Sequence, residues 1–220
     1  MTRTDTDSQL SIEASEFLWT EEGLIPAHRY LLPAVTKALQ QCGARTVLDL
    51  GCGNGAVTSA LAKMGFEMTG MDSSETGLAI AREKYPGISF QHANIETPLP
   101  PEICQRFDAV IAVEVIEHLL LPRALFQRAR EAIKPNGTFI ATTPYHGYVK
   151  NLVLAMTNKF DSHWHPLRDY GHVKFFSPAT LTQLFSEQSF AIESVGRLGR
   201  IPLLAKSMIV QGQAGAAVDI

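Results

Sequence analysis

The stretch from Thr46 to Gly55 reads Thr-Val-Leu-Asp-Leu-Gly-Cys-Gly-Asn-Gly, and it decides the fold that we expect for this chain. Its first half is a short apolar run, which ends at three glycines spaced one residue apart. Such a run is typical of a buried parallel strand that enters a tight loop. Residues 56–64 then have the composition of a helix, which Gly65 ends. Strand, glycine loop and helix together predict a nucleotide-binding site.

The charge beside the loop limits which ligands the loop can bind. The dinucleotide fingerprint is G-x-G-x-x-G, whereas this loop is G-x-G-x-G and Asp49 stands two residues before the first glycine. A carboxylate at this point would repel a pyrophosphate but attract a ligand that carries an ammonium or sulfonium charge. The pattern therefore favours S-adenosylmethionine over NAD, and a purely structural turn is the alternative.

Residues Leu48–Gly55 resemble motif I of the class I S-adenosylmethionine-dependent methyltransferases. Residues 66–72 predict a second strand that ends in Asp72, which lies 72 − 55 = 17 positions after Gly55. An acid near that offset hydrogen-bonds ribose hydroxyls in this type of fold. The resemblance implies a methyl-donor site formed by Asp49, Gly51, Cys52, Gly53, Asn54, Gly55, Asp72 and Ser73.

Two further strand ends complete the expected cofactor site. The end of the strand predicted at 88–94 resembles the adenine-binding motif of the family, which implies contacts from Ala93, Asn94 and Ile95. The family usually has an acid where this chain has Asn94, and an amide oxygen can accept the same hydrogen bond. Val113 and Glu114, at the end of the strand predicted at 107–113, are the remaining expected contacts.

The amino-acid composition limits the classes of protein to which the chain can belong. The chain has 220 residues, of which 45% are hydrophobic and 19% charged, and this is typical of one globular core. The net charge of −3 disfavours nucleic acid and anionic membranes as partners, so we expect a small-molecule acceptor. Three scattered cysteines predict reduced thiols in a cytoplasmic setting, and we expect no signal peptide or transmembrane segment. The oligomeric state has no signature in the sequence.

Strands and helices alternate from residue 46 to about 187, which predicts an α/β fold with a doubly wound, mostly parallel sheet. Later strands are expected at 138–144, 190–195 and 205–210. Helices are expected at 26–41, from Ser73 or Ser74 to about 85, at 122–133 and at 179–187. The resemblance implies the seven-stranded, Rossmann-like methyltransferase sheet, whose last strand inserts antiparallel.

The domain organisation follows from these elements. Residues 46–210 are expected to form a single methyltransferase domain, in which about 145–172 is an insertion that builds a wall of the substrate pocket. Its second part, from 160 to 172, is expected to be a loop. Residues 1–45 are expected to form a helical lid or cap, with a first helix at 11–22 that either covers the pocket or only packs on the core. Residues 211–220 are expected to be a loose tail.

A second chemical motif, Glu114-Val-Ile-Glu117-His118, follows the 107–113 strand. If residues 114–120 begin a helix, Glu114, Glu117 and His118 share one of its faces. They would then converge at the carboxyl end of a parallel strand, where ligands bind in open sheets. Two carboxylates and an imidazole suit a divalent metal, with oxygen ligands favouring magnesium or manganese and the nitrogen admitting zinc or iron.

The Glu-x-x-Glu-His pattern is similar to the metal-binding residues of two groups, the ubiquinone-biosynthesis O-methyltransferases and the small-RNA 3′-terminal 2′-O-methyltransferases. In both groups a second histidine lies shortly before an aromatic residue and a helix start, a placement that His172 shares. The resemblance implies that Glu114, Glu117, His118 and His172 bind the metal. Metal-free relatives also carry Glu-His-Leu, so a metal-free site with His118, His146 or His172 as general base stays open.

The favoured function is O-methylation of a small-molecule phenolic, catechol or quinol hydroxyl by S-adenosylmethionine, with or without metal assistance. The catalytic candidates are Glu117, His118, His146 and His172. Two alternatives remain: 2′-O-methylation of RNA 3′ ends, and a regulatory protein that binds S-adenosylmethionine without catalysis.

Overall fold

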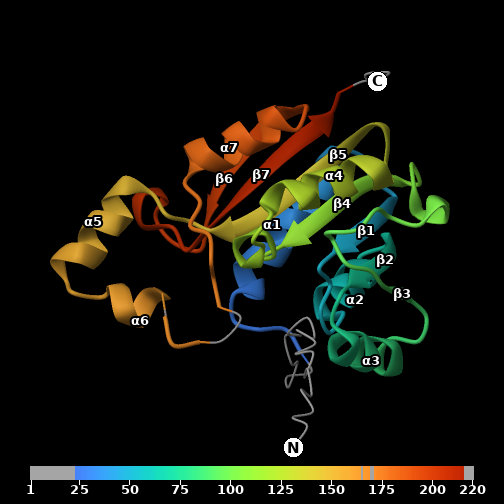
Figure 1. The fold of residues 1–220 in the computed structure, drawn as a ribbon, viewed down its shortest axis with the longest axis horizontal. Helices are drawn as coiled ribbons and strands as arrows, with labels where there is room; N and C mark the ends of the chain where they lie inside the picture. Colours follow the sequence, from blue (N-terminus) through green and yellow to red (C-terminus); the bar gives the residue numbers. More distant parts are fainter. Residues whose placement is uncertain (1–22, 165, 169–170, 216–220) are drawn as a thin grey trace, which may run out of the picture.

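The computed structural model describes residues 23–164, 166–168 and 171–215 (Figure 1). The helix predicted at 11–22 lies outside these ranges. Within them, no helix combines the length and the apolar character that crossing a membrane requires.

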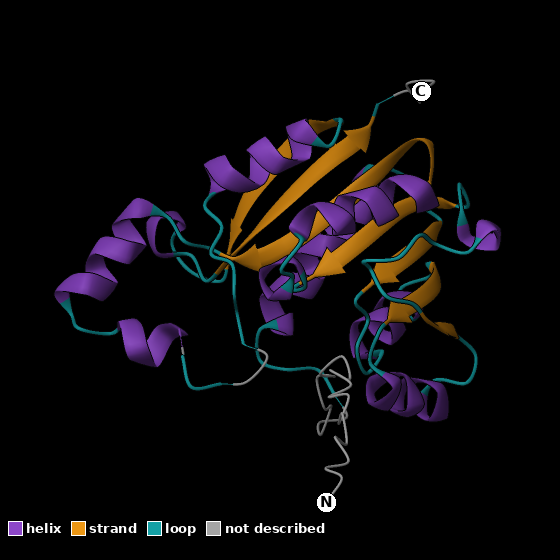
Figure 2. Ribbon diagram, viewed as in Figure 1, coloured by secondary structure: helices purple, strands orange, loops and turns teal. Residues whose placement is uncertain are grey.

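The centre of the fold is a seven-stranded sheet with the strand order β3-β2-β1-β4-β5-β7-β6 (Figure 2). Strand β7 is antiparallel to both of its neighbours, and the pairs from β3 to β5 are all parallel. This confirms the doubly wound, mostly parallel sheet with an inserted antiparallel last strand. The strands are β1 (Thr46–Leu50), β2 (Glu67–Asp72), β3 (Ser89–His92), β4 (Phe107–Val113), β5 (Ile133–Pro144), β6 (Phe190–Leu198) and β7 (Ser207–Ala214).

Two of the helices begin at serine caps that the sequence predicts. The hydroxyl of Ser74 accepts from the backbone N–H of Gly77 at 3.1 Å, and Ser177 forms a reciprocal capping box with Thr180. The helices are α1 (His28–Gln41), α2 (Ala56–Ala62), α3 (Glu75–Lys84), α4 (Pro122–Ala132), α5 (Tyr148–Met156), α6 (Phe160–Trp164) and α7 (Pro178–Glu187). Three short 3₁₀ turns are η1 (Pro101–Ile103), η2 (Ile116–His118) and η3 (Pro202–Leu204).

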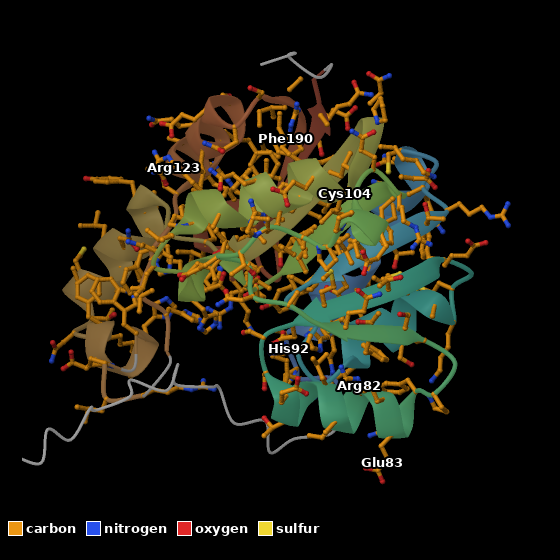
Figure 3. The ribbon with its side chains drawn as sticks, turned by 45° about the vertical axis from the view of Figure 1, so that its right-hand side comes forward. Arg82, Glu83, His92, Cys104, Arg123 and Phe190 are labelled. Atoms are coloured by element: carbon orange, nitrogen blue, oxygen red, sulfur yellow. The ribbon has the colours of Figure 1, made fainter. Side chains whose placement is uncertain are left out.

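Two hydrophobic layers cover the sheet, because successive residues of a strand point to opposite faces. Leu48 and Leu50 face the layer that contains α4 and α7, whereas Val47 faces the layer that contains α1 and α2. In the first layer the rings of Phe126, Phe139, Phe185 and Phe190 contact one another edge-on and stacked. Phe190 marks this cluster beneath α7 in Figure 3. These layers hold the strand ends that carry the site.

The last strand corrects the expectation of a loose tail. Residues 211–214 belong to β7, where Gln211 pairs with Ile140 of β5 and with Ser194 of β6. Backbone hydrogen bonds on both sides order a stretch whose polar and small residues suggest a tail in isolation. β5 also begins earlier than expected, at Ile133, which pairs with Phe107.

The insertion after β5 is more helical than expected. Helices α5 and α6 extend past the end of the sheet, away from α2 and α3 (Figure 1). The segment predicted to be a loop from residue 160 contains α6, in which Phe160 packs against Trp164 with ring centroids 4.4 Å apart. A single aromatic contact of this kind is not visible as a periodic pattern in so short a segment.

Phe126 offers a test of the packed layer. Truncation of Phe126 to alanine removes a side chain with no exposed surface, and we expect it to lower the free energy of unfolding by about 3–5 kcal/mol. Urea denaturation measures the change. Leu120→Ala, at a side chain that is 70% exposed, is the control and should change stability by about 0.5 kcal/mol or less. Equal losses in the two variants would contradict this packing.

Candidate functional site

The glycine loop after β1 adopts a backbone that ordinary residues rarely take. The φ angles of Gly51, Gly53 and Gly55 are 82°, 52° and 72°, all in the left-handed region. A Cβ on Gly51 would lie 2.6 Å from a methyl carbon of Val115, so the loop passes closely over the segment that follows β4. The spacing of these glycines is therefore required by the turn and by the approach of a second strand end.

Asp72 ties the glycine loop to the end of β2. One of its carboxylate oxygens accepts from the N–H of Gly53 and the other from the N–H of Ser74, both at 2.8 Å. The carbonyl of Met71 accepts from Gly51 and Cys52 at 2.7 and 3.1 Å. Asp72 is half-buried, and a carboxylate oxygen can accept more than one hydrogen bond.

Asp49 lies beneath the loop and is 1% exposed. Its carboxylate accepts a hydrogen bond of 2.6 Å from the Thr58 hydroxyl. Burial, reinforced by the nearby charge of Asp72, raises the pKa of Asp49 to about 7. The two acids therefore share one region, and a cation placed there would favour the ionised form of both.

The expected adenine side lies at the end of β3, beside α3, where Figure 3 shows His92 and Arg82. The N–H of Ala93 donates to the carbonyl of Asp72 at 2.9 Å, which joins this segment to β2. Asn94 is exposed, and its amide oxygen accepts from the N–H of Glu96 at 2.8 Å. The Asn94 oxygen therefore already caps a local turn. Ile95 is half-buried against the main core.

Glu114 does not share a helical face with Glu117 and His118, so that prediction is wrong. The helical turn η2 begins only at Ile116, and Glu114 has a left-handed φ of 57°. Its N–H donates to the carbonyl of Thr142 at 3.2 Å, and one carboxylate oxygen accepts from the Ser207 hydroxyl at 3.4 Å. Burial raises the pKa of Glu114 to about 7. The left-handed residue reverses the chain, which turns this side chain toward β7.

Glu117, His118 and His172 do come together. Their ligand atoms all lie within 4.8 Å of one another, and Glu114 is outside this cluster. The two imidazole rings meet edge-on, with centroids 4.8 Å apart. One oxygen of the buried Glu117 accepts from the Thr143 hydroxyl at 2.8 Å, while the other is 4.0 Å from Nε2 of His172 and has no hydrogen bond in the described part of the chain. Burial, with the charge of Glu114, raises the pKa of Glu117.

Backbone hydrogen bonds explain how residue 172 reaches residue 117. The carbonyl of Glu117 accepts from the N–H groups of Val173 and Lys174 at 2.8 and 3.0 Å. The chain that leaves the insertion is thus fastened directly to η2. His172 is consequently held opposite His118.

His146 lies apart from this cluster, in an aromatic wall. Its ring is 5.1 Å from that of Phe175, 5.7 Å from that of His163 and 6.5 Å from that of Trp164. Burial and the nearby Lys150 ammonium lower the pKa of His146 to about 4. The imidazole is therefore neutral at neutral pH and a weak base.

The sequence interpretation missed Thr58, Thr143 and Lys150. The two threonines donate to the buried acids, and Lys150 is 9% exposed with its ammonium bonded to the carbonyl of Tyr145 at 2.7 Å. Thr142-Thr143 at the end of an apolar strand was an available signal, because polar residues there face the ligand edge of a sheet.

Comparison with known proteins identifies this arrangement. A family described as methyltransferase domain matches residues 25–195 of the chain. The chain belongs to this methyltransferase family. The glycine loop and the acids Asp49 and Asp72 lie within the matched residues, and the family supports S-adenosylmethionine as the cofactor.

Named relatives of the methyltransferase include the ubiquinone biosynthesis O-methyltransferase of Methylobacterium nodulans. It is 32% identical over 158 residues, which are 70% of this chain and 59% of that protein. The methyltransferase spans about three fifths of the length of the first curated relatives that it matches.

Solved structures share the fold of the methyltransferase. Magnesium protoporphyrin IX methyltransferase from Synechocystis PCC 6803, solved with bound SAH, has a TM-score of 0.63 at 17% identity and covers 84% of this chain and 82% of its own. The methyltransferase domain of bacterial CtHen1 has a TM-score of 0.64 at 22% identity and covers 83% and 97%. At these identities the likeness shows the fold alone.

The buried Asp49 makes stability depend on pH. Its folded pKa of about 7 exceeds the unfolded value, so the folded state keeps a proton that the unfolded state loses, and stability falls as pH rises from about 4 to about 7. Asp49→Asn keeps an acceptor for Thr58 but removes this loss. We expect the cofactor-free variant to gain about 2–4 kcal/mol over wild type at pH 8 and little at pH 4. Urea denaturation across this range, with the exposed Asp161→Asn as control, measures it. A difference that does not change with pH would contradict the assignment.

Proposed function

We propose that the methyltransferase transfers the methyl group of S-adenosylmethionine to a phenolic, catechol or quinol oxygen of a small molecule. The observation that carries the proposal is the cluster of Glu117, His118 and His172, with a buried carboxylate oxygen that has no hydrogen bond among the described residues. Gly51 packs against Val115, one residue before the turn that bears Glu117 and His118, so the cluster adjoins the cofactor loop. The relatives named as ubiquinone biosynthesis O-methyltransferases support an oxygen acceptor.

The roles of the cofactor-binding residues are part of this proposal. Asp72 would accept from the ribose hydroxyls, and Asp49 would stabilise the positive charge of the donor through the loop. Ser73, Ala93, Ile95 and Val113 would line the adenosine and methionyl portions. Asn94 would contact adenine through its amide N–H₂, because its oxygen is engaged by Glu96.

Methyl transfer requires that the methyl group and the acceptor oxygen are aligned and that the acceptor is deprotonated. The Glu117 carboxylate and the two imidazoles are a donor set that fits a divalent cation, and one Glu117 oxygen is open to it. Glu117, His118 and His172 would hold magnesium, manganese or zinc, which would lower the pKa of the acceptor hydroxyl. Glu114 would not be a ligand, because it faces Ser207 instead.

The same residues also support a metal-free route. His118 and His172 are exposed imidazoles that can accept the hydroxyl proton, and the Glu117 carboxylate beside His172 would stabilise the resulting imidazolium. His146 is the poorer base because of its lowered pKa. Its place in the aromatic wall favours contact with the ring of the acceptor.

Two other functions are less well supported. Methylation of RNA 3′ ends would suit the histidine pattern, but a net charge of −3 does not favour a polyanion. A regulatory protein without catalysis would have no use for a buried acid with an unsatisfied oxygen, which is costly to stability.

Asp72→Ala tests the cofactor site. The substitution removes acceptors for the ribose and for the loop, so we expect the dissociation constant for S-adenosylmethionine to rise by about 10- to 100-fold. Isothermal titration calorimetry measures it, and Asp161→Asn, at an exposed acid of α6, is the control. Unchanged affinity in Asp72→Ala would remove this residue from the site.

Glu117→Gln tests the acceptor site. We expect turnover on catechols to fall by about 100-fold or more, while affinity for S-adenosylmethionine stays within about threefold of wild type. Steady-state kinetics with and without EDTA distinguish the two routes, because only the metal-assisted one loses activity to the chelator. Glu102→Gln, at an exposed acid of η1, is the matched control. A fully active Glu117→Gln variant would refute the proposed site.

A further inference from the structure

Outside the cluster of Glu117, His118 and His172, the methyltransferase has a second hollow. A cavity of about 350 Å³ lies between α5, α6 and the turn that joins β6 to β7. Its polar lining comes from Lys150, His163, Arg200 and Lys206, and its apolar lining includes Val153 and Leu204. A volume of this order suits a substituent or a small ring.

The charges of this cavity are all of one sign. None of the described residues that line it is acidic, although the chain as a whole has a net charge of −3. Neither Arg200 nor Lys206 forms an ion pair with a carboxylate in the described ranges, and the Lys206 ammonium lies 5.8 Å from the ring centroid of Tyr30. A concentration of positive charge in a lining that contains no carboxylate favours an anionic ligand.

Lys150 forms the buried part of this lining. It is 9% exposed, and its ammonium donates to the carbonyl of Tyr145 at 2.7 Å, which leaves two further N–H donors. Burial, together with the charge of Arg200, lowers the pKa of Lys150 to about 8. An anion in the cavity would relieve this repulsion, and the charged groups would bind it with charge-assisted hydrogen bonds.

The cavity adjoins the aromatic wall around His146. The ring of His163, which lines the cavity, lies 5.7 Å from that of His146. Tyr145, whose carbonyl accepts from Lys150, directly precedes His146, and Thr143, which donates to Glu117, lies two residues before Tyr145. Residues 143–150 therefore connect Glu117 with the lining of the cavity.

We propose that this cavity binds a carboxylate or similar anionic substituent of the methyl acceptor, held by Lys150, Arg200 and Lys206. Val153 and Leu204 would cover the adjoining hydrocarbon. The inference rests on the proposed function and specifies its substrate class, an aromatic hydroxyl compound that carries an acidic group. The overall acidity of the protein hides this local basic site.

A pair of unreactive probes tests the charge preference. We expect the protein with S-adenosylhomocysteine bound to bind 3,4-dimethoxybenzoate at least about 10-fold more tightly than the neutral isostere 3,4-dimethoxybenzamide. The ratio of the two dissociation constants should fall by about 3- to 10-fold in Arg200→Gln and in Lys206→Gln, and approach one in the double variant. Both side chains are exposed, so the fold should persist, which circular dichroism checks.

Lys159→Gln is the matched control, because this lysine is exposed between α5 and α6 and does not line the cavity. It should keep the wild-type ratio. Equal affinity of wild type for the two probes, or an unchanged ratio in the double variant, would overturn the inference.

Turnover of 3,4-dihydroxybenzoate and 3,4-dihydroxybenzamide separates this inference from the proposed function. A preference for the acid in kcat/KM that follows the binding ratio supports both. If the protein binds the benzoate more tightly but turns over no catechol, the proposed function is contradicted and the anion site is still supported. Turnover that favours the amide while binding favours the acid would show that the anion binds unproductively, and would overturn the assignment to the acceptor.

Discussion

The structure depends on the hydrogen bonds that Asp72 accepts from two backbone N–H groups, one on each side of the cofactor site. The bond from Gly53 fixes the glycine loop after β1, and the bond from Ser74 fixes the start of α3. Left-handed glycines are needed for this, because the loop must turn back over the sheet and pass Val115 at close range. One carboxylate thus joins the glycine loop after β1 to the start of α3. In the proposed site, the cofactor would bind to a backbone that is already ordered, so little conformational entropy would be lost on binding.

A second backbone contact organises the acceptor side. Because the carbonyl of Glu117 accepts from Val173 and Lys174, the chain returns from α6 to the rim of the sheet. This brings His172 to His118 across more than fifty residues of sequence. The insertion contributes His146 and Trp164 to the aromatic wall, and it lines the basic cavity together with the turn between β6 and β7. The glycine loop and its acids therefore belong to the sheet, whereas the aromatic wall and part of the cavity lining belong to the added helices.

Electrostatics divide the site into two regions of opposite sign. Asp49 and Glu117 are buried, Glu114 is half-buried, and all three acids have raised pKa values. The positive region consists of Lys150 on α5 and of Arg200 and Lys206 at the turn between β6 and β7. Buried charges of either sign cost stability when they are unpaired. Their retention at one edge of the sheet is typical of a functional site, where the ligand supplies the missing partner.

The sequence by itself determined the alternation of strands and helices, the glycine loop, the two acids Asp49 and Asp72, and most helix starts, because each rests on local chemistry: apolar runs, glycine backbone freedom and capping hydroxyls. It also placed Glu117, His118 and His172 among the candidates. Only the tertiary structure decided that Glu114 turns away at a left-handed residue, that residues 211–214 complete β7, and that Lys150 is buried beside Arg200. Such outcomes depend on partners that are distant in the chain. For β7 these partners are its neighbouring strands, and for Lys150 they are residues of the turn after β6. No local sequence pattern encodes which distant groups will meet.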